Sequence, residues 1–162
     1  MSARQVITAL EARGLILATA ESCTGGLIAG AITDIAGSSA VFHRGYVAYS
    51  NRAKREMLTV GAATLEEHGA VSEPVAAEMA WGAWRASGAD VAIAVTGIAG
   101  PGGSGTKPEG RVCFGLCLKG KLQTETVEFG ALGRAEVRAA TVAHALALVL
   151  DRVERDLPDR PA

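Results

Sequence analysis

The segment DVAIAV, residues 90–95, has five consecutive apolar side chains after its aspartate. A strand that alternates apolar and polar residues has one face in water, whereas a continuously apolar strand is covered on both faces. LILATA, residues 15–20, is a second apolar run of strand length. These two segments predict a central sheet that is covered by helices on both sides.

Helical and strand-like patterns alternate along the rest of the chain. Apolar periodicity predicts helices over 3–13, 24–37, 51–58, 63–69, 73–87 and 134–157. Thr24 is the expected N-cap of the second helix and Gly37 its stop, while Ser72 and Gly88 bound the helix over 73–87. Strands are expected over 42–50 and in a hairpin formed by 110–118 and 122–130. This order predicts an α/β fold, namely a three-layer α/β/α sandwich on a mixed, mostly parallel central sheet.

Length, charge and composition limit the kinds of function. The 162 residues predict one domain over 1–162, with a frayed tail at 158–162. The formal net charge is −1 and no basic cluster occurs, so a nucleic-acid surface is not expected. No run of about 18 apolar residues predicts a membrane span. The first residues read as an amphipathic helix rather than a signal peptide, so a cytoplasmic protein is expected.

The three cysteines do not form a metal-binding or disulfide pattern. Cys23, Cys113 and Cys117 are odd in number and unsuitably spaced for a zinc site. Cys113 and Cys117 share one face of a strand, so they are expected to act as small core side chains. The sequence therefore predicts no metal site.

Three polar, glycine-containing segments adjoin predicted strands: ESCTGG (21–26), the stretch 37–56, and TGIAGPGGSGTKPEG (96–110). Ligands of open α/β sheets bind outside the carboxyl ends of the strands, so these segments are candidates for lining a crevice. ESCTGG precedes a predicted helix, and its backbone N–H groups could bind an anion there. A plain helix start with nothing bound is an equally simple reading.

The glycine-rich segment resembles two known motifs without satisfying either. GPGGSGTK (100–107) has threonine and lysine in the reverse of the phosphate-loop order, and a strand follows it instead of a helix. SGTK (104–107) matches Ser-x-x-Lys, but a flexible loop does not place the lysine beside the serine. A mobile cover over a substrate, including Lys107, is the better interpretation.

The stretch 37–56 contains a candidate nucleophile with two sets of possible bases. Ser39 could pair with His43, but no acidic residue is evident to orient that imidazole, and His43 is expected to be a half-exposed strand residue. Alternatively, Tyr49 could relay the proton of the serine, with its own proton held by a desolvated Lys54. The residues alone leave this choice open.

The chain nevertheless resembles a known family. TAESCTGG, GSSAVFHRGYVAYSNRAK, HGAVSEPVAAEMA and VTGIAGPGGSGTKPEGRV occur in the order typical of the CinA C-terminal domain family, and the similarity covers about residues 5–155. The resemblance implies a three-layer α/β/α sandwich and an activity that requires no cofactor or metal. It also implies hydrolysis of the carboxamide of nicotinamide mononucleotide (NMN) to nicotinate mononucleotide and ammonia, in pyridine-nucleotide salvage.

The family resemblance implies a catalytic set of serine, tyrosine and lysine, which corresponds to Ser39, Tyr49 and Lys54 here. Ser39 would attack the carboxamide carbon, and Tyr49, poised by Lys54, would accept its proton. Backbone N–H groups, including that of Ser39, would hold the oxyanion. Two positions depart from the family pattern without touching this set: His43 replaces a common acidic residue, and Glu109 a common aliphatic one.

The 5′-phosphate of the substrate needs cationic or N–H partners. The candidates lie at the ESCTGG helix start, at the TGIAG turn and in GRAEVRAA near the C-terminal helix. The predicted substrate-binding residues are Glu21, Ser22, Thr24, Gly25, Thr96, Gly97, Arg134 and Arg138. Glu21 could bind the ribose or the carboxamide, or pair with one of the two arginines.

A second hypothesis is a catalytically silent module that binds a nucleotide or a protein partner, linked to competence or DNA damage. Three intact catalytic residues argue against it, because a silent module has no physical need for them. A hydrolase of another amide or ester is a further alternative. The apolar C-terminal helix, with Trp81 and Trp84, favours a homodimer or a higher homo-oligomer.

Overall fold

The computed structural model of the chain describes residues 2–159 and contains six α-helices and five strands among them. The helices are α1 (Ala3–Arg13), α2 (Leu27–Thr33), α3 (Asn51–Leu58), α4 (Ala62–His68), α5 (Glu73–Ser87) and α6 (Arg134–Asp156). The strands are β1 (Leu17–Glu21), β2 (Phe42–Val47), β3 (Val91–Gly97), β4 (Arg111–Leu118) and β5 (Lys121–Glu128). Most of the tail predicted to fray, residues 160–162, lies outside the described residues.

The five strands form one sheet in the order β2-β1-β3-β4-β5. β1 pairs in parallel with β2 on one side and with β3 on the other. The later hairpin of β4 and β5 adds two antiparallel pairings beside β3. The predicted mixed sheet is therefore confirmed, and β4 is the strand that runs against the others.

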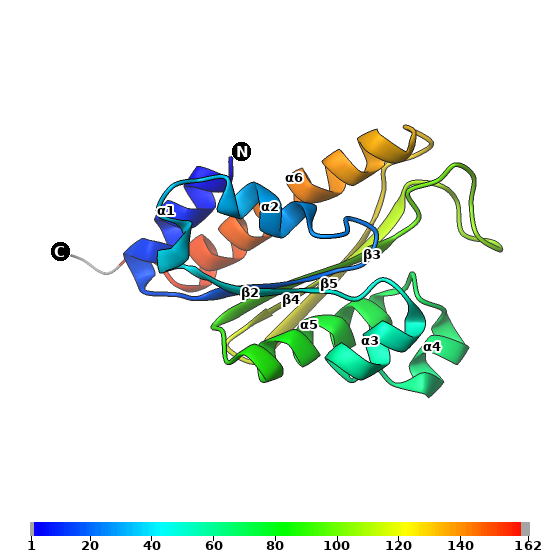
Figure 1. Cartoon of the computed structure of the whole chain (residues 1–162), viewed down its shortest axis with the longest axis horizontal. Coiled ribbons are helices and arrows are strands. Elements are labelled where there is room, and N and C mark those ends of the chain that lie inside the picture. Colours follow the sequence, from blue (N-terminus) through cyan, green and yellow to red (C-terminus); the bar gives the residue numbers. More distant parts are fainter. Residues whose placement is uncertain (1, 160–162) are drawn as a thin grey trace.

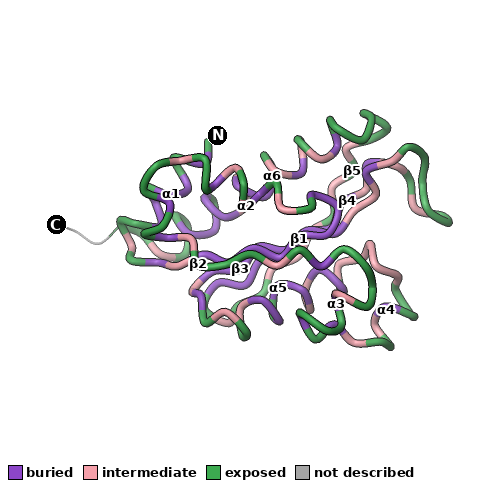
Figure 2. The backbone as a smooth tube through the Cα atoms, in the orientation of Figure 1, coloured by how far each residue is buried: buried purple, intermediate pink, exposed green. Residues whose placement is uncertain are grey.

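Helices cover both faces of the sheet, as the double-sided apolar strands predict. α1, α2 and α6 lie on one face, and α3, α4 and α5 lie on the other (Figure 1). β3 serves both layers by alternation: Val91, Ile93 and Val95 pack in the core under α1 and α6, whereas Ala92 and Ala94 pack in the core under α5. Buried residues accordingly run through the centre of the molecule (Figure 2).

The helices predicted over 3–13, 51–58 and 73–87 are confirmed within their bounds, with Ser72 as the N-cap of α5. The second helix is shorter than predicted. Thr24 was expected to cap it, but α2 begins at Leu27 after Gly26, and it ends at Thr33, before Gly37. The Thr24 hydroxyl instead donates a hydrogen bond to the Glu21 carboxylate, and that carboxylate accepts hydrogen bonds from the N–H groups of Ile28 and Ala29 in the first turn of the helix.

Other sequence expectations concern the cysteines, the tryptophans and the membrane. Cys23, Cys113 and Cys117 are all free and buried, as expected for small core side chains in the β4 pair. Trp81 and Trp84 lie on α5 with ring centroids 5.1 Å apart, and Trp81 is partly exposed. None of the helices in residues 2–159 combines the length and apolar character needed to cross a bilayer.

Close packing of α5 against the end of α3 gives a test of the fold. A Cβ at Gly82 would lie 1.9 Å from the Leu58 carbonyl oxygen, so Gly82→Ala should lower the free energy of unfolding by about 1–3 kcal/mol. The matched variant is Gly30→Ala in α2, where a Cβ meets no atom within 4 Å. That variant should raise the free energy by about 0.5–1 kcal/mol. Urea unfolding of both variants measures the difference, and a stabilised Gly82→Ala would contradict the packing.

Candidate active site

The parallel pairing of β1 with β2 and β3 brings three loops to one edge of the sheet. Glu21, the last residue of β1, pairs with Val47 of β2 and Val95 of β3. The chain segments after these three strands therefore start side by side. This is the edge at which open α/β sheets bind ligands.

A cavity of about 370 Å³ lies at this edge. Its lining comes from the segment after β1, from the segment after β2 with the start of α3, from the α4–α5 turn, from the glycine-rich loop and from the start of α6. The lining residues are Ser22, Cys23, Tyr49, Asn51, Lys54, Ala70, Val71, Thr96–Ser104 and Arg134. A ligand of nucleotide size fits a cavity of this volume.

Lys54 lies at the bottom of this cavity with almost no exposed surface. Its Nζ donates hydrogen bonds to the Ser22 Oγ and to the Tyr49 backbone carbonyl, both at 2.9 Å. No carboxylate of residues 2–159 forms an ion pair with it. Burial without a counter-charge lowers the pKa of Lys54 below its ordinary value. The neutral form of Lys54 is therefore more populated than that of an exposed lysine at the same pH, and neutral Lys54 can accept a proton from Ser22.

Ser22 follows β1 directly and is nearly buried. Its Oγ lies 2.9 Å from the Lys54 Nζ and 3.5 Å from the Tyr49 carbonyl oxygen. A hydroxyl beside a desolvated amine is the arrangement in which a serine becomes a nucleophile. The neighbouring Cys23 does not compete for this role, because burial raises the pKa of its thiol to about 11 and keeps it protonated.

The structure does not bring Ser39 together with Tyr49 and Lys54. Ser39 is exposed in the short 3₁₀ helix Ser38–Ala40, which precedes the amino end of β2. Tyr49 and Lys54 follow the carboxyl end of the same strand, roughly 17 Å further along at the usual rise of a strand. The predicted nucleophile is therefore separated from its predicted bases by the whole length of β2.

Tyr49 lines the cavity but does not connect a serine with Lys54. Its backbone carbonyl, not its hydroxyl, receives the Lys54 hydrogen bond, and its hydroxyl accepts a hydrogen bond from Arg134 at 3.0 Å. The side chain is 58% exposed. The predicted proton relay through the phenol is thus without a path in this geometry. His43, the other candidate base, is an exposed residue of β2 beside Arg44, close to the half-exposed strand position expected for it.

Glu21 is buried beneath the turn instead of facing the cavity. Its carboxylate accepts hydrogen bonds from the Thr24 hydroxyl and from the backbone N–H groups of Ile28 and Ala29. These are unpaired N–H groups of the first turn of α2, which an acidic side chain satisfies well. Among the described residues Glu21 therefore pairs with neither arginine, and its carboxylate is already engaged within the protein. Thr24 is its donor and also lies outside the cavity lining.

The two predicted arginines have different positions on α6. Arg134 lines the cavity, where its guanidinium donates to the Gly100 carbonyl at 2.7 Å and to the Tyr49 hydroxyl. Arg138 lies outside the lining and donates to the backbone carbonyls of Cys23 and Thr24. Gly25 packs beside Arg138 and does not line the cavity either. Of the two, only Arg134 is placed to meet a ligand.

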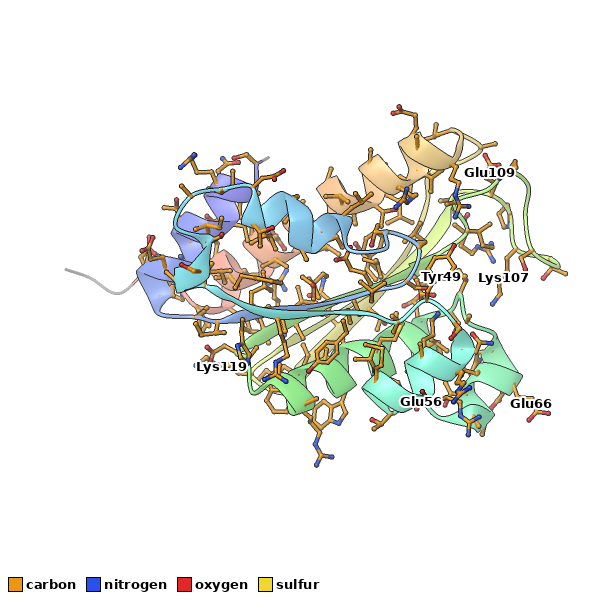
Figure 3. The ribbon with its side chains drawn as sticks, viewed as in Figure 1. Tyr49, Glu56, Glu66, Lys107, Glu109 and Lys119 are labelled. Carbon is orange, nitrogen blue, oxygen red and sulfur yellow. The ribbon has the colours of Figure 1, made fainter. Side chains whose placement is uncertain are left out.

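The glycine-rich loop forms one wall of the cavity and is held by hydrogen bonds of two of its side chains, Lys107 and Glu109. The Lys107 Nζ donates to the carbonyls of His68 and Val71, both at 2.6 Å. The Glu109 carboxylate accepts from the N–H groups of Gly102 at 2.7 Å and Gly133 at 3.4 Å. Figure 3 shows Lys107, Glu109 and Tyr49 at the same end of the molecule. The loop is thus anchored over the α4–α5 turn and at the start of α6.

Thr96 and Gly97 complete the back of the cavity, as predicted for the carboxyl end of β3. The Thr96 hydroxyl donates to the Ala70 carbonyl at 2.8 Å and so fixes the α4–α5 turn against the sheet. Its hydroxyl proton is therefore already engaged within the protein. Asn51, at the start of α3, lines the cavity and was missed by the sequence analysis. No group of three metal-binding side chains was found among residues 2–159.

The fold and the cavity define an α/β protein with a buried serine–lysine pair, an arrangement suited to acyl transfer. The sequence model of the CinA C-terminal domain family matches residues 1–153, and the chain belongs to this family. The chain is 58% identical over 127 residues to a nicotinamide-nucleotide amidohydrolase PncC of Enterobacter agglomerans, covering 77% of each protein. It is 61% identical over 111 residues to the Escherichia coli K12 protein of that name, covering 68% of this chain and 67% of that one.

Solved structures show the same fold. A competence/damage inducible protein CihA from Agrobacterium tumefaciens superimposes with a TM-score of 0.89 at 52% identity, covering 92% of each chain. A CinA superfamily protein from Klebsiella pneumoniae superimposes with a TM-score of 0.92 at 40% identity, covering 94% of this chain and 96% of that one. The family expected from the sequence motifs is therefore confirmed, as is its α/β fold.

The buried position of Glu21 gives a test that separates a structural role from a substrate-binding role. Glu21→Gln replaces one carboxylate oxygen by an NH₂ group, which would face N–H donors of α2. The free energy of unfolding should fall by about 1–3 kcal/mol in urea titrations. The control is Glu56→Gln, an exposed partner of Arg52 on α3, with an expected change below about 0.5 kcal/mol. Equal stability of Glu21→Gln and the wild type would argue for a free carboxylate.

Proposed function

We propose that this chain hydrolyses the carboxamide of NMN to nicotinate mononucleotide and ammonia. The proposal rests on the buried Ser22–Lys54 pair in the cavity, together with the amidohydrolase names of the close relatives. Amide hydrolysis needs an activated nucleophile and an acid for the amine that leaves. Ser22 and Lys54 supply both.

We assign the nucleophile to Ser22 in place of Ser39. Neutral Lys54 accepts the Ser22 proton as Oγ attacks the carboxamide carbon, and the C=O oxygen becomes an oxyanion. Protonated Lys54 then donates to the amide nitrogen, the C–N bond breaks, and ammonia leaves a nicotinoyl ester on Ser22. Water, deprotonated by Lys54, attacks this ester, and its collapse releases nicotinate mononucleotide and restores the Ser22 hydroxyl. One water is consumed for each ammonia formed.

The oxyanion needs N–H donors beside Ser22. The N–H of Cys23 follows the nucleophile directly, and Cys23 lines the cavity. No acceptor for this N–H occurs in the backbone hydrogen bonds of residues 2–159. We therefore assign this group to the oxyanion, where a preorganised donor contributes most in a site screened from water.

The remaining lining fits the other parts of NMN. Arg134 lies at the exposed start of α6 and is proposed to bind the 5′-phosphate through charge-assisted hydrogen bonds. The pyridinium ring carries a positive charge, and the Tyr49 ring at the cavity wall offers an aromatic face for a cation. Ile98 and Val71 provide apolar surface for the ring edge.

The silent-binding alternative has less support from the geometry. Burial of an amine without a carboxylate partner destabilises the folded chain, and a module that only binds gains nothing from it. A homodimer and a cytoplasmic location stay predictions of the sequence.

The decisive experiment measures ammonia released from NMN by the purified chain. Ser22→Ala should reduce kcat by at least about 1,000-fold, because removal of a nucleophile eliminates covalent catalysis. Ser39→Ala is the matched control and should retain wild-type turnover, since Ser39 lies at the opposite end of β2. The reverse result would restore Ser39 as the nucleophile. No ammonia from folded wild type would favour the binding module.

The lowered pKa of Lys54 gives a pH profile with a definite sign. Protonated Lys54 cannot accept a proton, so kcat/KM should rise with pH as Lys54 becomes neutral and then level off. The midpoint of this rise should lie below pH 10.5, the ordinary lysine pKa, because burial favours the neutral form. Lys54→Arg stays charged and should be inactive throughout.

Initial rates at limiting NMN across this pH range check the profile, with unfolding followed at each pH to exclude loss of structure. A profile that is flat with pH would contradict proton transfer to Lys54.

A further inference from the structure

We propose that Arg138 is a positioning residue, which acts on the reaction by holding the turn that carries Ser22 and the N–H of Cys23. The inference rests on the proposed function in one respect, because its kinetic test uses NMN. Its structural part is independent of the substrate. It assigns to Arg138 a role different from the phosphate binding expected from the sequence.

The Arg138 guanidinium reaches from α6 to the backbone of the turn after β1. Its Nε donates to the Cys23 carbonyl oxygen at 3.1 Å, and its Nη2 donates to the Thr24 carbonyl oxygen at 3.2 Å. The planar guanidinium can direct two donors at two neighbouring acceptors, which a lysine ammonium does less well. A Cβ at Gly25 would lie only 3.6 Å from Nη2, so the turn packs closely on the guanidinium.

These contacts fix the part of the turn that other hydrogen bonds leave free. The Ser22 carbonyl accepts from the Gly25 N–H, and the Thr24 carbonyl accepts from the Leu27 N–H. For the Cys23 carbonyl, Arg138 is the one donor found among residues 2–159. The orientation of the peptide between Cys23 and Thr24 therefore depends on Arg138.

This peptide matters because Cys23 directly follows the nucleophile and itself carries the proposed oxyanion donor. The N–H and the carbonyl of Cys23 are joined through a single Cα, so loss of the hydrogen bond to the carbonyl lets this Cα shift and carries the oxyanion donor with it. A misplacement of about 1 Å near the reacting atoms can cost about 100-fold in rate. Arg138 thus holds catalytic geometry without touching the substrate.

Arg134, one helical turn earlier on α6, is the matched comparison. Both residues are arginines on the same helix, but Arg134 lines the cavity and Arg138 does not. Arg134→Met should raise KM for NMN more than it changes kcat, as expected for a phosphate partner used in the ground state and the transition state alike. Arg138→Met should lower kcat by about 100-fold with KM within about twofold of the wild type.

A second readout needs no substrate. Cys23 is 6% exposed, and loosening of its turn should admit an alkylating reagent. Iodoacetamide should modify Cys23 in Arg138→Met at least about tenfold faster than in the wild type, because losing hydrogen bonds from a charged donor favours local opening. Arg134→Met should show no change. Cys113 and Cys117, which are buried in β4, serve as internal controls for global unfolding.

The outcomes separate the two proposals. Faster alkylation confined to Cys23, with a kcat effect in Arg138→Met, supports the positioning role. An unchanged Cys23 rate, or a rise in KM without a fall in kcat, overturns it. If wild type releases no ammonia from NMN, the proposed function fails, while the alkylation rates still decide whether Arg138 holds the turn. Should Arg138→Met not fold, Arg138→Lys is measured, with a smaller effect of the same sign expected.

Discussion

The pairing of β1 with a parallel strand on each side is the constraint on which the rest of the structure depends. It places β1 inside the sheet, where helices cover both faces and every side chain of β1 is buried; LATAE has one leucine, three small residues and one carboxylate that is hydrogen-bonded to α2. It also aligns the carboxyl ends of β1, β2 and β3, so that the segments that follow them share one cavity. The position of the site is therefore a consequence of strand direction.

The turn after β1 carries Ser22, the proposed nucleophile, at this edge of the sheet. Glu21 satisfies N–H groups at the start of α2, and Arg138 satisfies carbonyl groups of the turn. The Glu21 carboxylate thus binds the Thr24 side chain of the turn, and the Arg138 guanidinium of α6 binds its backbone. Ser22 is held between them, where Lys54 can reach its hydroxyl. Glu21 and Arg138, which the sequence suggested as ligands, thus form hydrogen bonds with the backbone of the protein itself.

Most of the fold could be predicted from the sequence, because double-sided apolar strands, caps and helical periodicity are local signals. The start of α2 was harder to predict. Threonine is a common N-cap residue, but the Thr24 hydroxyl binds the Glu21 carboxylate and the helix begins at Leu27. Tyr49, Lys54 and Arg134, which the sequence analysis expected at the site, line the cavity. The contact between Lys54 and Ser22 was not predicted, because Ser22 is 32 residues away and the contact depends on the register of β1 and β2. The family resemblance pointed to Ser39, whose position at the amino end of β2 only the fold reveals.

The glycine-rich wall has a consequence for how this site can change during evolution. A Cβ at Gly100 would collide with Glu109, and one at Gly103 would lie 2.3 Å from the Lys107 carbonyl oxygen. New side chains on these two positions would thus disturb the anchoring of the loop before they altered the cavity. Variation that adapts the site to other substrates should therefore accumulate at lining residues outside the loop, such as Tyr49 and Asn51, while Gly100 and Gly103 stay glycine.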